Sequence, residues 1–308
     1  MNNKLDTAIK LLENDRSQIL YAIFRNMTSL GFTRWIPDEQ YIKIMYRLSM
    51  GKKLNLTSPS TFNEKLQYLK LHDRRKEYIT LVDKYRVRDY IVKKIGEEYL
   101  IPLIGVWDTT HDIDFETLPE QFVLKCNHDS GSVFVCKNKH EINKQEICSK
   151  MQKSLKTSGF WFGREWPYKN VKACVIAEKY MVDSRFNELR DFKFFCFNGK
   201  VKCFKIDYDR FTEHKANYYA PDGTLLKFGE KVCPPDYSKE LYIPENLNEM
   251  ICLAEKLAVD YAFVRVDFYN IDGKIYFGEM TFYPASGFGQ FIPEEWDKIL
   301  GDWLLLKI

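Results

Sequence analysis

Two very short connections between apolar segments constrain the fold of this chain more than any other feature. Asn198-Gly199 and Asp272-Gly273 each separate two largely apolar runs. Asn-Gly and Asp-Gly are the dipeptides that most strongly favour a two-residue β-hairpin turn. Such a turn joins antiparallel strands, because parallel neighbours need a long crossover connection. The segments joined are 191–197 with 200–206, and 262–269 with 274–282. The turns predict mainly antiparallel sheets and argue against a wholly parallel, doubly wound sheet.

The rest of the chain divides into a helical beginning and a mixed remainder, which predicts an α+β protein. Apolar residues recur at helical spacing in the N-terminal region. Thr61 and Glu64 have the spacing of a capping box, so we interpret both as structural. Asp83 is expected to cap a helix that starts at Lys84 and ends at Gly96. Further strands are expected at 121–126, 132–136 and 171–181, helices at 144–156 and 246–259, and a loop with turns at 207–245.

Charge balance and cysteine spacing exclude several classes of protein. The 308 residues include 46 basic and 43 acidic side chains, a balance that does not indicate a nucleic-acid-binding protein. The eight cysteines form no Cys-x-x-Cys pair and the five histidines are dispersed, unlike the close spacing of zinc motifs. The polar start does not resemble a signal peptide, and no run of about 18 apolar residues predicts a membrane span. A reducing cytoplasm is the expected compartment.

The register of the second hairpin decides whether two of its carboxylates meet. With a regular two-residue turn, Asp267 would lie opposite Gly278. With a three-residue loop, or with a bulge, Asp267 would lie opposite Glu279 and Arg265 opposite Thr281. Adjacent carboxylates repel each other unless a cation lies between them, and Mg²⁺ prefers oxygen ligands. The second register predicts a magnesium site, whereas the alternative interpretation is a pair of exposed strand carboxylates paired with lysines.

Two strand lysines and one strand end are candidates for nucleotide binding. Lys125 interrupts an apolar strand and is followed by a loop of small residues containing Ser130 and Gly131, whose backbone N–H groups could contact phosphate oxygens. Lys193 shares a strand face with aromatic residues. Residues 178–181, Glu-Lys-Tyr-Met, could offer a strand edge to an adenine. Each feature taken alone also fits an ordinary turn or a half-exposed strand lysine.

The order of these features resembles the ATP-grasp superfamily and, more closely, the TupA-like ATP-grasp family found in bacterial surface-polysaccharide gene clusters. The resemblance extends from about Asp38 to the end of the chain. It rests on the sequence motifs at 59–67, 83–91, 123–131, 178–181, 191–200, 265–267 and 278–281. It implies two α+β lobes with mainly antiparallel sheets around an ATP cleft, preceded by a helical region at 1–82. The ATP-grasp domain would cover 83–308, with a lid lobe at about 118–182 and a C-terminal lobe at about 183–308.

The resemblance also implies roles for individual residues. Lys125 and Lys193 would hold ATP phosphates, with Ser130 and Gly131 covering them. Glu178, Lys179 and Met181 would contact the adenine and ribose. Asp267 and Glu279 would bind one or two Mg²⁺ ions and Arg265 would face the γ-phosphate or an acyl phosphate. Many superfamily members have asparagine where this chain has Thr281, whose hydroxyl would serve as the further metal ligand.

The implied reaction is amide ligation through an acyl phosphate, for which no side-chain nucleophile is needed. The expected partners are ATP, a carboxylate-bearing sugar or glycan and an amine donor. A peripheral association with the polysaccharide assembly machinery is a further possible interaction. Arg210 is a candidate clamp for the substrate carboxylate.

Two rival functions remain open from the sequence. Asp207-Tyr208-Asp209 has the Asp-x-Asp form with which a glycosyltransferase holds a metal and a nucleotide-sugar. An aromatic content of 15% would also suit a nonenzymatic carbohydrate-binding module.

Overall fold

The sheets of this protein are antiparallel throughout the part of the chain that is described. The computed structural model describes residues 17–129, 131–185, 189–208, 213–239 and 242–306. The named strands form a six-stranded, a four-stranded and a two-stranded sheet, and every pairing among them is antiparallel. The prediction of an α+β fold with antiparallel sheets is therefore confirmed.

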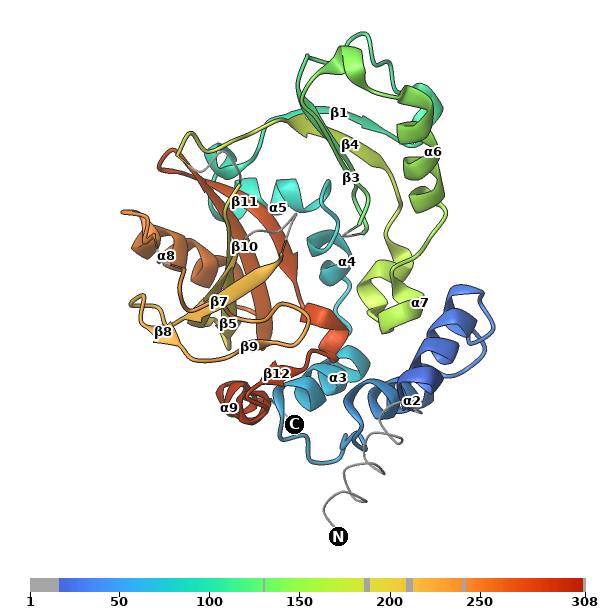
Figure 1. Cartoon of the computed structure of the whole chain (residues 1–308), viewed down its shortest axis with the longest axis vertical. Helices are drawn as coiled ribbons and strands as arrows, with labels where there is room; N and C mark the ends of the chain where they lie inside the picture. Colours follow the sequence, from blue (N-terminus) through green and yellow to red (C-terminus); the bar gives the residue numbers. More distant parts are fainter. Residues whose placement is uncertain (1–16, 130, 186–188, 209–212, 240–241, 307–308) are drawn as a thin grey trace.

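Both predicted hairpins belong to the six-stranded sheet, where they form four neighbouring strands. Its order is β11-β10-β5-β6-β7-β8. The strands are β5 (Asp191–Phe197), β6 (Lys200–Tyr208), β7 (Lys215–Tyr219), β8 (Leu225–Leu226), β10 (Phe263–Ile271) and β11 (Lys274–Thr281). Helix α8 (Leu247–Ala258) packs on one face, where the Cys196 thiol lies 3.9 Å from the carbonyl oxygen of Ala254 (Figure 1). Because side chains alternate along β5, Lys193 and its odd-numbered neighbours point to the other face.

The four-stranded sheet stands apart from the larger sheet, at the top of Figure 1. Its order is β1-β4-β2-β3. The strands are β1 (Leu103–Trp107), β2 (Phe122–Cys126), β3 (Val133–Cys136) and β4 (Val175–Lys179), and helix α6 (Lys144–Leu155) packs against β2. A separate apolar core, including Phe122, Leu124 and Ile147, lies between them. This sheet begins at Leu103, ahead of the lid lobe expected from about residue 118.

The N-terminal region is helical, as predicted. Residues 17–29 form a helix, followed by α2 (Asp38–Met50), α3 (Phe62–His72), α4 (Glu77–Leu81) and α5 (Val87–Lys94). Thr61 and Glu64 form the predicted capping box at the start of α3. Asp83 accepts hydrogen bonds from the backbone of Tyr85 and Arg86, at 2.9 and 3.1 Å, in the turn that leads into α5.

The remaining elements are short or lie at the end of the chain. They are η1 (Glu97–Tyr99), η2 (Thr110–Asp112), η3 (Lys139–Glu141), α7 (Phe160–Gly163), η4 (Trp166–Asn170), β9 (Gly229–Glu230), η5 (Pro284–Gly287), β12 (Phe291–Ile292) and α9 (Glu295–Trp303). Within the described residues, no helix is long and apolar enough to cross a membrane.

Three predicted boundaries were wrong. Residues 207–245 contain β7, β8 and β9 rather than a loop alone. In β7 four consecutive residues are buried, so the alternation that marks a half-exposed strand is missing. Strand β4 runs from Val175 to Lys179, within the predicted 171–181, and residues 171–174 connect it to η4. Helix α5 starts at Val87, three residues later than expected, because the Asp83 turn precedes it.

Lys70 is a fully buried lysine that ties three distant segments together. Its ammonium donates to the carbonyl oxygens of Gly163 at 2.6 Å and Ser286 at 2.8 Å, and it lies 4.7 Å from the centre of the Phe288 ring. Burial lowers the pKa of Lys70, with Glu165 opposing part of the shift. The unfolded chain, where the lysine pKa is about 10.4, therefore binds more protons than the folded protein at mildly alkaline pH.

We expect this lysine to make folding stability rise with pH. Stability increases with pH wherever the unfolded state binds more protons, which for Lys70 means the interval between its lowered pKa of about 7 and about pH 10.4. Lys70→Met should flatten that rise, as measured by urea unfolding between about pH 7 and 10. Lys298→Met, at a lysine whose side chain is 54% exposed, is the matched control and should keep the wild-type slope. An equal slope in wild type and Lys70→Met would contradict the prediction.

Candidate functional site

A bulge in the late hairpin sets the register on which the predicted metal site depends. The turn takes two residues, since Ile271 pairs with Lys274, but the register shifts between Asp267 and Phe268. As a result Asp267 lies opposite Glu279 and Arg265 opposite Thr281, with Gly278 as the additional residue. A Cβ on Gly278 would lie 3.0 Å from the backbone oxygen of Asp267, so glycine suits the bulge. The register predicted for a shared site is confirmed, and the bulge produces it.

Arg265 holds the two carboxylates of this hairpin together. Its Nε and Nη2 atoms donate to the two oxygens of Asp267, both at 2.7 Å, and Nη2 also donates to Glu279 at 2.7 Å. The Thr281 hydroxyl donates to the same Glu279 oxygen at 2.9 Å. Oxygen atoms of three side chains thus converge around one guanidinium. Two carboxylates and a hydroxyl are hard oxygen donors, and this set fits Mg²⁺.

The electrostatics of the two carboxylates differ. Burial raises the pKa of Asp267, while Arg265 and Lys193 oppose the shift. Burial also acts on Glu279, but the positive charges of Lys84 and Arg265 outweigh it and lower the pKa of Glu279 to about 2. The pKa of Arg265 is raised because its carboxylate partners outweigh burial. The charges of these three side chains therefore depend on one another. Perturbed pKa values of this kind are common at functional sites.

Strand pairing places Lys193 beside the hairpin carboxylates. Lys193 on β5 lies opposite Asp267 on β10, which in turn lies opposite Glu279 on β11. Cross-strand partners share one face of a sheet, so a lysine and two carboxylates form a row across three strands. On the other side of Lys193 the row continues to Lys205 on β6. This row lies on the face opposite α8, and we call it the charged row.

Lys193 is buried and carries its charge because acidic partners surround it. Its ammonium contacts Asp191 and lies 2.6 Å from Asp207. Burial lowers its pKa, but Asp191, Asp267 and Asp207 together raise the pKa of Lys193 to about 12. Phe195, an aromatic residue on the same face of β5, is buried beside it.

Lys125 and Glu178 form a second charged group, on the four-stranded sheet. The Lys125 ammonium lies 2.7 Å from Glu178, whose carboxylate is also 3.7 Å from Arg88. Glu178 is buried, Met181 half-buried and Lys179 exposed at the end of β4. The contacts that Lys125 and Glu178 would make with a nucleotide stay a prediction.

Lys84 joins the two charged groups, and sequence reasoning missed it. Its ammonium donates to the backbone oxygen of Asp129, in the loop after β2, and lies 4.0 Å from Glu279. Its side chain is 14% exposed, and burial lowers its pKa, with Glu279 opposing. The only sequence signal was its position after the capping residue Asp83. A lysine beside a helix start is usually solvated, so the pattern gave no reason to place it in a site.

Several predicted residues lie outside or at the margin of what is described. Ser130 and Arg210 are outside the described residues, as is Asp209 of the Asp-x-Asp motif. Gly131 is described and exposed, and a Cβ there would meet nothing within 4 Å. Asp207 lies within β6 and is buried against Lys193. One oxygen of Asp207 pairs with Lys193, and because Asp209 lies outside the described residues the Asp-x-Asp motif stays a prediction.

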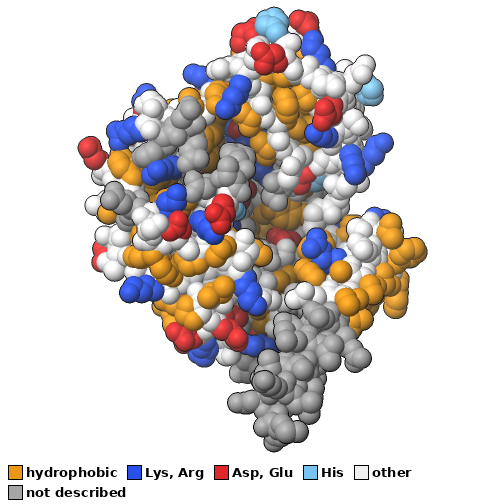
Figure 2. All heavy atoms as spheres, in the orientation of Figure 1, with side chains coloured by type: hydrophobic (Ala, Val, Ile, Leu, Met, Phe, Trp, Pro, Cys, Tyr) orange, Lys and Arg blue, Asp and Glu red, His pale blue; other side chains and the backbone are white. Residues whose placement is uncertain are grey.

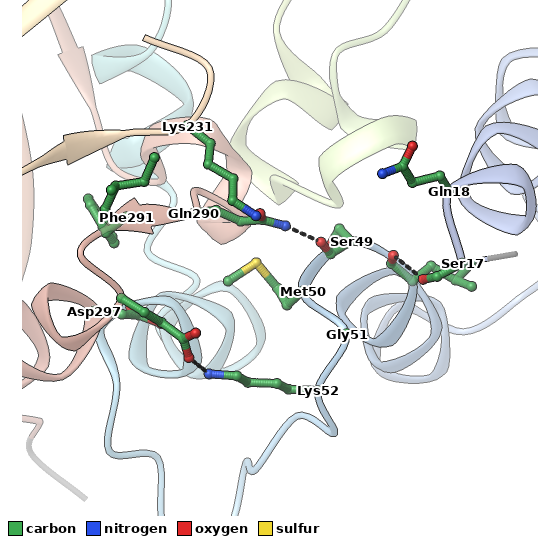
Figure 3. A pocket seen from close by; sticks show the side chains of 13 residues that line it. Ser17, Gln18, Ser49, Met50, Gly51, Lys52, Lys231, Gln290, Phe291 and Asp297 are labelled. Carbon is green, nitrogen blue, oxygen red and sulfur yellow. Dashed lines mark hydrogen bonds and ion pairs between the residues drawn. The ribbon is translucent and has the colours of Figure 1, made fainter. Parts of the chain in front are cut away.

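The molecular surface carries a recess, a groove and a cavity among the described residues. Figure 2 shows a recess between the four-stranded lobe at the top and the helical region at the lower right. A groove of about 660 Å³ lies on the four-stranded lobe, lined by Gly131 and α6. A cavity of about 380 Å³ lies near the end of α2, where Lys231, Gln290 and Ser49 come from separate elements and point toward one another (Figure 3). Neither the groove nor the cavity is lined by the charged row.

Solved structures with a similar arrangement include several ligases. The D-alanine–D-alanine ligase from Bacillus anthracis is 18% identical, with 73% of this chain and 66% of that chain covered and a TM-score of 0.40. The same enzyme complexed with ATP is 16% identical, with 85% and 72% covered and a TM-score of 0.40. The D-alanine–D-alanine ligase from Helicobacter pylori is 12% identical, with 80% and 70% covered and a TM-score of 0.39. The chain thus spans about two thirds of the length of the first of these.

A comparison with protein families gives a match over most of the chain. A model described as TupA-like ATPgrasp matches residues 64–305, which include the charged row, Lys84 and Lys125. No curated protein matches the chain. The chain belongs to the TupA-like ATP-grasp family.

Proposed function

We propose that the protein is an ATP- and Mg²⁺-dependent ligase that joins a carboxylate to an amine through an acyl phosphate. Membership of an ATP-grasp family supports an ATP-dependent ligase at a general level. The observation that carries the proposal is the charged row: Lys193, Asp267 and Glu279 lie side by side on one sheet face, next to Arg265. Positive groups for phosphate oxygens and oxygen ligands for a metal are thus built into the same rigid sheet.

The proposal gives each group a role in positioning ATP. Lys84, Lys125 and Lys193 would contact its phosphates, with the backbone at 130–131 covering them. Glu178, Lys179 and Met181 would contact the adenine and ribose. Asp267, Glu279 and Thr281 would hold the Mg²⁺, which when bound offsets charge on the transferred phosphate. The four-stranded sheet would serve as the lid lobe and the six-stranded sheet as the core of the C-terminal lobe.

The chemistry needs positioning and charge neutralisation rather than a nucleophilic side chain. A substrate carboxylate oxygen would bond to the γ-phosphorus as the bond to ADP breaks. The amine would then attack the acyl carbon, lose a proton and release phosphate, leaving an amide. Arg265 would face the transferred phosphate, and Arg210 would hold the substrate carboxylate. In line with the family, we propose a carboxylate-bearing surface polysaccharide or its precursor as the acid.

Nucleotide binding gives the first test. We expect Mg-ATP to raise the melting temperature of the protein, because a ligand that binds only the folded state stabilises it. Lys125→Met should weaken ATP binding by about tenfold or more, since a charge-assisted contact contributes about 1.5–3 kcal/mol. Lys202→Met, at an exposed strand lysine, should leave it unchanged. Isothermal titration measures both variants.

The same assay separates the ligase from the rival functions. Stabilisation by a UDP-sugar and not by ATP would support the glycosyltransferase. The carbohydrate-binding module predicts no ADP release with any combination of acid and amine. ADP release that requires Mg²⁺ and increases when an acid and an amine are both supplied supports the ligase.

A further inference from the structure

A cysteine, a histidine and an aspartate from three segments of the chain meet beside the charged row. Asp207 is near the end of β6, His214 directly precedes β7 and Cys233 follows β9. Their ligand atoms all lie within 4.8 Å of one another. Backbone hydrogen bonds hold the segments in place: Cys233 N–H donates to Glu230 at 3.1 Å, and Ala216 N–H donates to Pro234 at 3.3 Å.

Two atoms of this cluster lack hydrogen-bond partners among the described residues. They are Oδ1 of Asp207 and Nε2 of His214. The Asp207 side chain is only 5% exposed, so an oxygen without a hydrogen bond there is costly. The two atoms lie 3.3 Å apart, yet their alignment is not that of a hydrogen bond. Two electron-pair donors that approach in this way are arranged to share a third atom.

We propose that Asp207, His214 and Cys233 bind one Zn²⁺ ion, at a site separate from the Mg²⁺ ligands of the late hairpin. Carboxylate oxygen, imidazole nitrogen and thiolate sulfur are the three ligand types that proteins offer to zinc. Zinc–ligand bonds of about 2.0–2.3 Å place tetrahedral ligands about 3.3–3.8 Å apart. The Asp207–His214 separation of 3.3 Å already meets this geometry, and the remaining separations, within 4.8 Å, need to close by at most about 1.5 Å.

The surrounding charges allow a cation at this position. The second oxygen of Asp207 lies 2.6 Å from Lys193, which leaves Oδ1 for the metal. Lys205 is 3.7 Å from Oδ1, but it is also 3.2 Å from Glu230, whose negative charge offsets it. Zinc binding by Cys233 would release the thiol proton. Three protein ligands leave the fourth position of a tetrahedral zinc to water or to a substrate group.

A zinc ion at this position would affect both Lys193 and the strands around it. Asp207 would bridge the zinc and Lys193, so the metal would fix the carboxylate that orients this lysine of the charged row. The ion would also connect β6 to β7 across 209–212, and both of them to the segment after β9. Zinc binding should therefore stabilise this half of the six-stranded sheet, with ATP absent.

The experiment measures metal binding directly on the full chain without nucleotide. Protein treated with a chelator and a thiol-free reductant is dialysed against micromolar ZnCl₂ with excess MgCl₂, and bound zinc is measured by mass spectrometry. The test variants are His214→Gln and Cys233→Ser. The matched controls are His140→Gln and Cys252→Ser, which change an exposed histidine and an exposed cysteine. Circular dichroism and the melting temperature show whether each variant is folded, and His214→Gln tests the site should Cys233→Ser fail to fold.

We expect about one zinc per chain in wild type and in both controls, and at least a tenfold loss in His214→Gln and Cys233→Ser. Co²⁺ in place of Zn²⁺ should give a sulfur-to-cobalt charge-transfer band that disappears in Cys233→Ser alone among the cysteine variants. Wild type without zinc, or zinc retained in His214→Gln, would overturn the proposal. Because no ATP is present, either outcome leaves the proposed ligase activity to its own test.

Discussion

Replacing both hairpin carboxylates with their amides, Asp267→Asn with Glu279→Gln, is expected to reduce Mg²⁺-dependent ADP release by about 10³-fold or more. A factor of 10³ corresponds to about 4 kcal/mol of barrier, the scale on which a metal stabilises charge in phosphoryl transfer. The amides keep the size of the side chains but remove two negative charges from the Mg²⁺ site. Arg265 is 2.7 Å from both carboxylates, so the change also frees the guanidinium from its strongest partners.

The measurement has to separate loss of metal binding from loss of structure. ADP release is followed over a Mg²⁺ titration, and the melting temperature is recorded for each variant. Asp222→Asn with Glu249→Gln is the matched control, because it removes two exposed carboxylates and leaves the charged row unchanged. A folded double variant with wild-type activity and wild-type Mg²⁺ dependence would show that the metal site lies elsewhere.

How far the sequence predicts this site depends on how local each constraint is. The two-residue turns predicted antiparallel pairing, because a turn of that length leaves one geometry only. The capping box at Thr61 and Glu64 was likewise predictable, since four consecutive residues contain the whole motif. For the pairing of Asp267 with Glu279 the sequence left two registers open. The bulge at Gly278 decides between them, and it depends on contacts of β10 with its neighbours on both sides.

The parts that could not be predicted depend on tertiary contacts. Lys84 enters the site because the loop after β2 folds back on it, which no local pattern indicates. Strand β7 is buried on both faces and so lacks the alternation by which strands are recognised. Asp207 was read as half of an Asp-x-Asp motif, but the fold places it against Lys193. Short motifs are weak predictors because the pairing of side chains across strands is set elsewhere in the chain.

Lys193→Met is expected to lower both the stability and the activity of the protein. Lys193 lies between Asp191 and Asp207 and opposite Asp267, and all three carboxylates are buried. Methionine has a similar length without the charge, so the variant leaves several buried carboxylates near one another with fewer cations. Removing one partner of a buried ion pair costs about 3–5 kcal/mol, because the remaining charge is uncompensated. We expect a comparable loss in the free energy of unfolding, together with loss of ADP release if Lys193 contacts a phosphate.

A double-mutant cycle with Asp191→Asn separates these two effects. Removing the neighbouring carboxylate should restore about 1–3 kcal/mol of the stability lost in Lys193→Met, because fewer unpaired charges then remain buried. It should not restore ADP release, since the asparagine replaces no contact with phosphate. Lys202→Met, at an exposed position of the neighbouring strand β6, is the control and should match wild type in both measurements. Recovery of activity together with stability would mean that Lys193 acts only by holding the sheet together, and its role in phosphate binding would then be wrong.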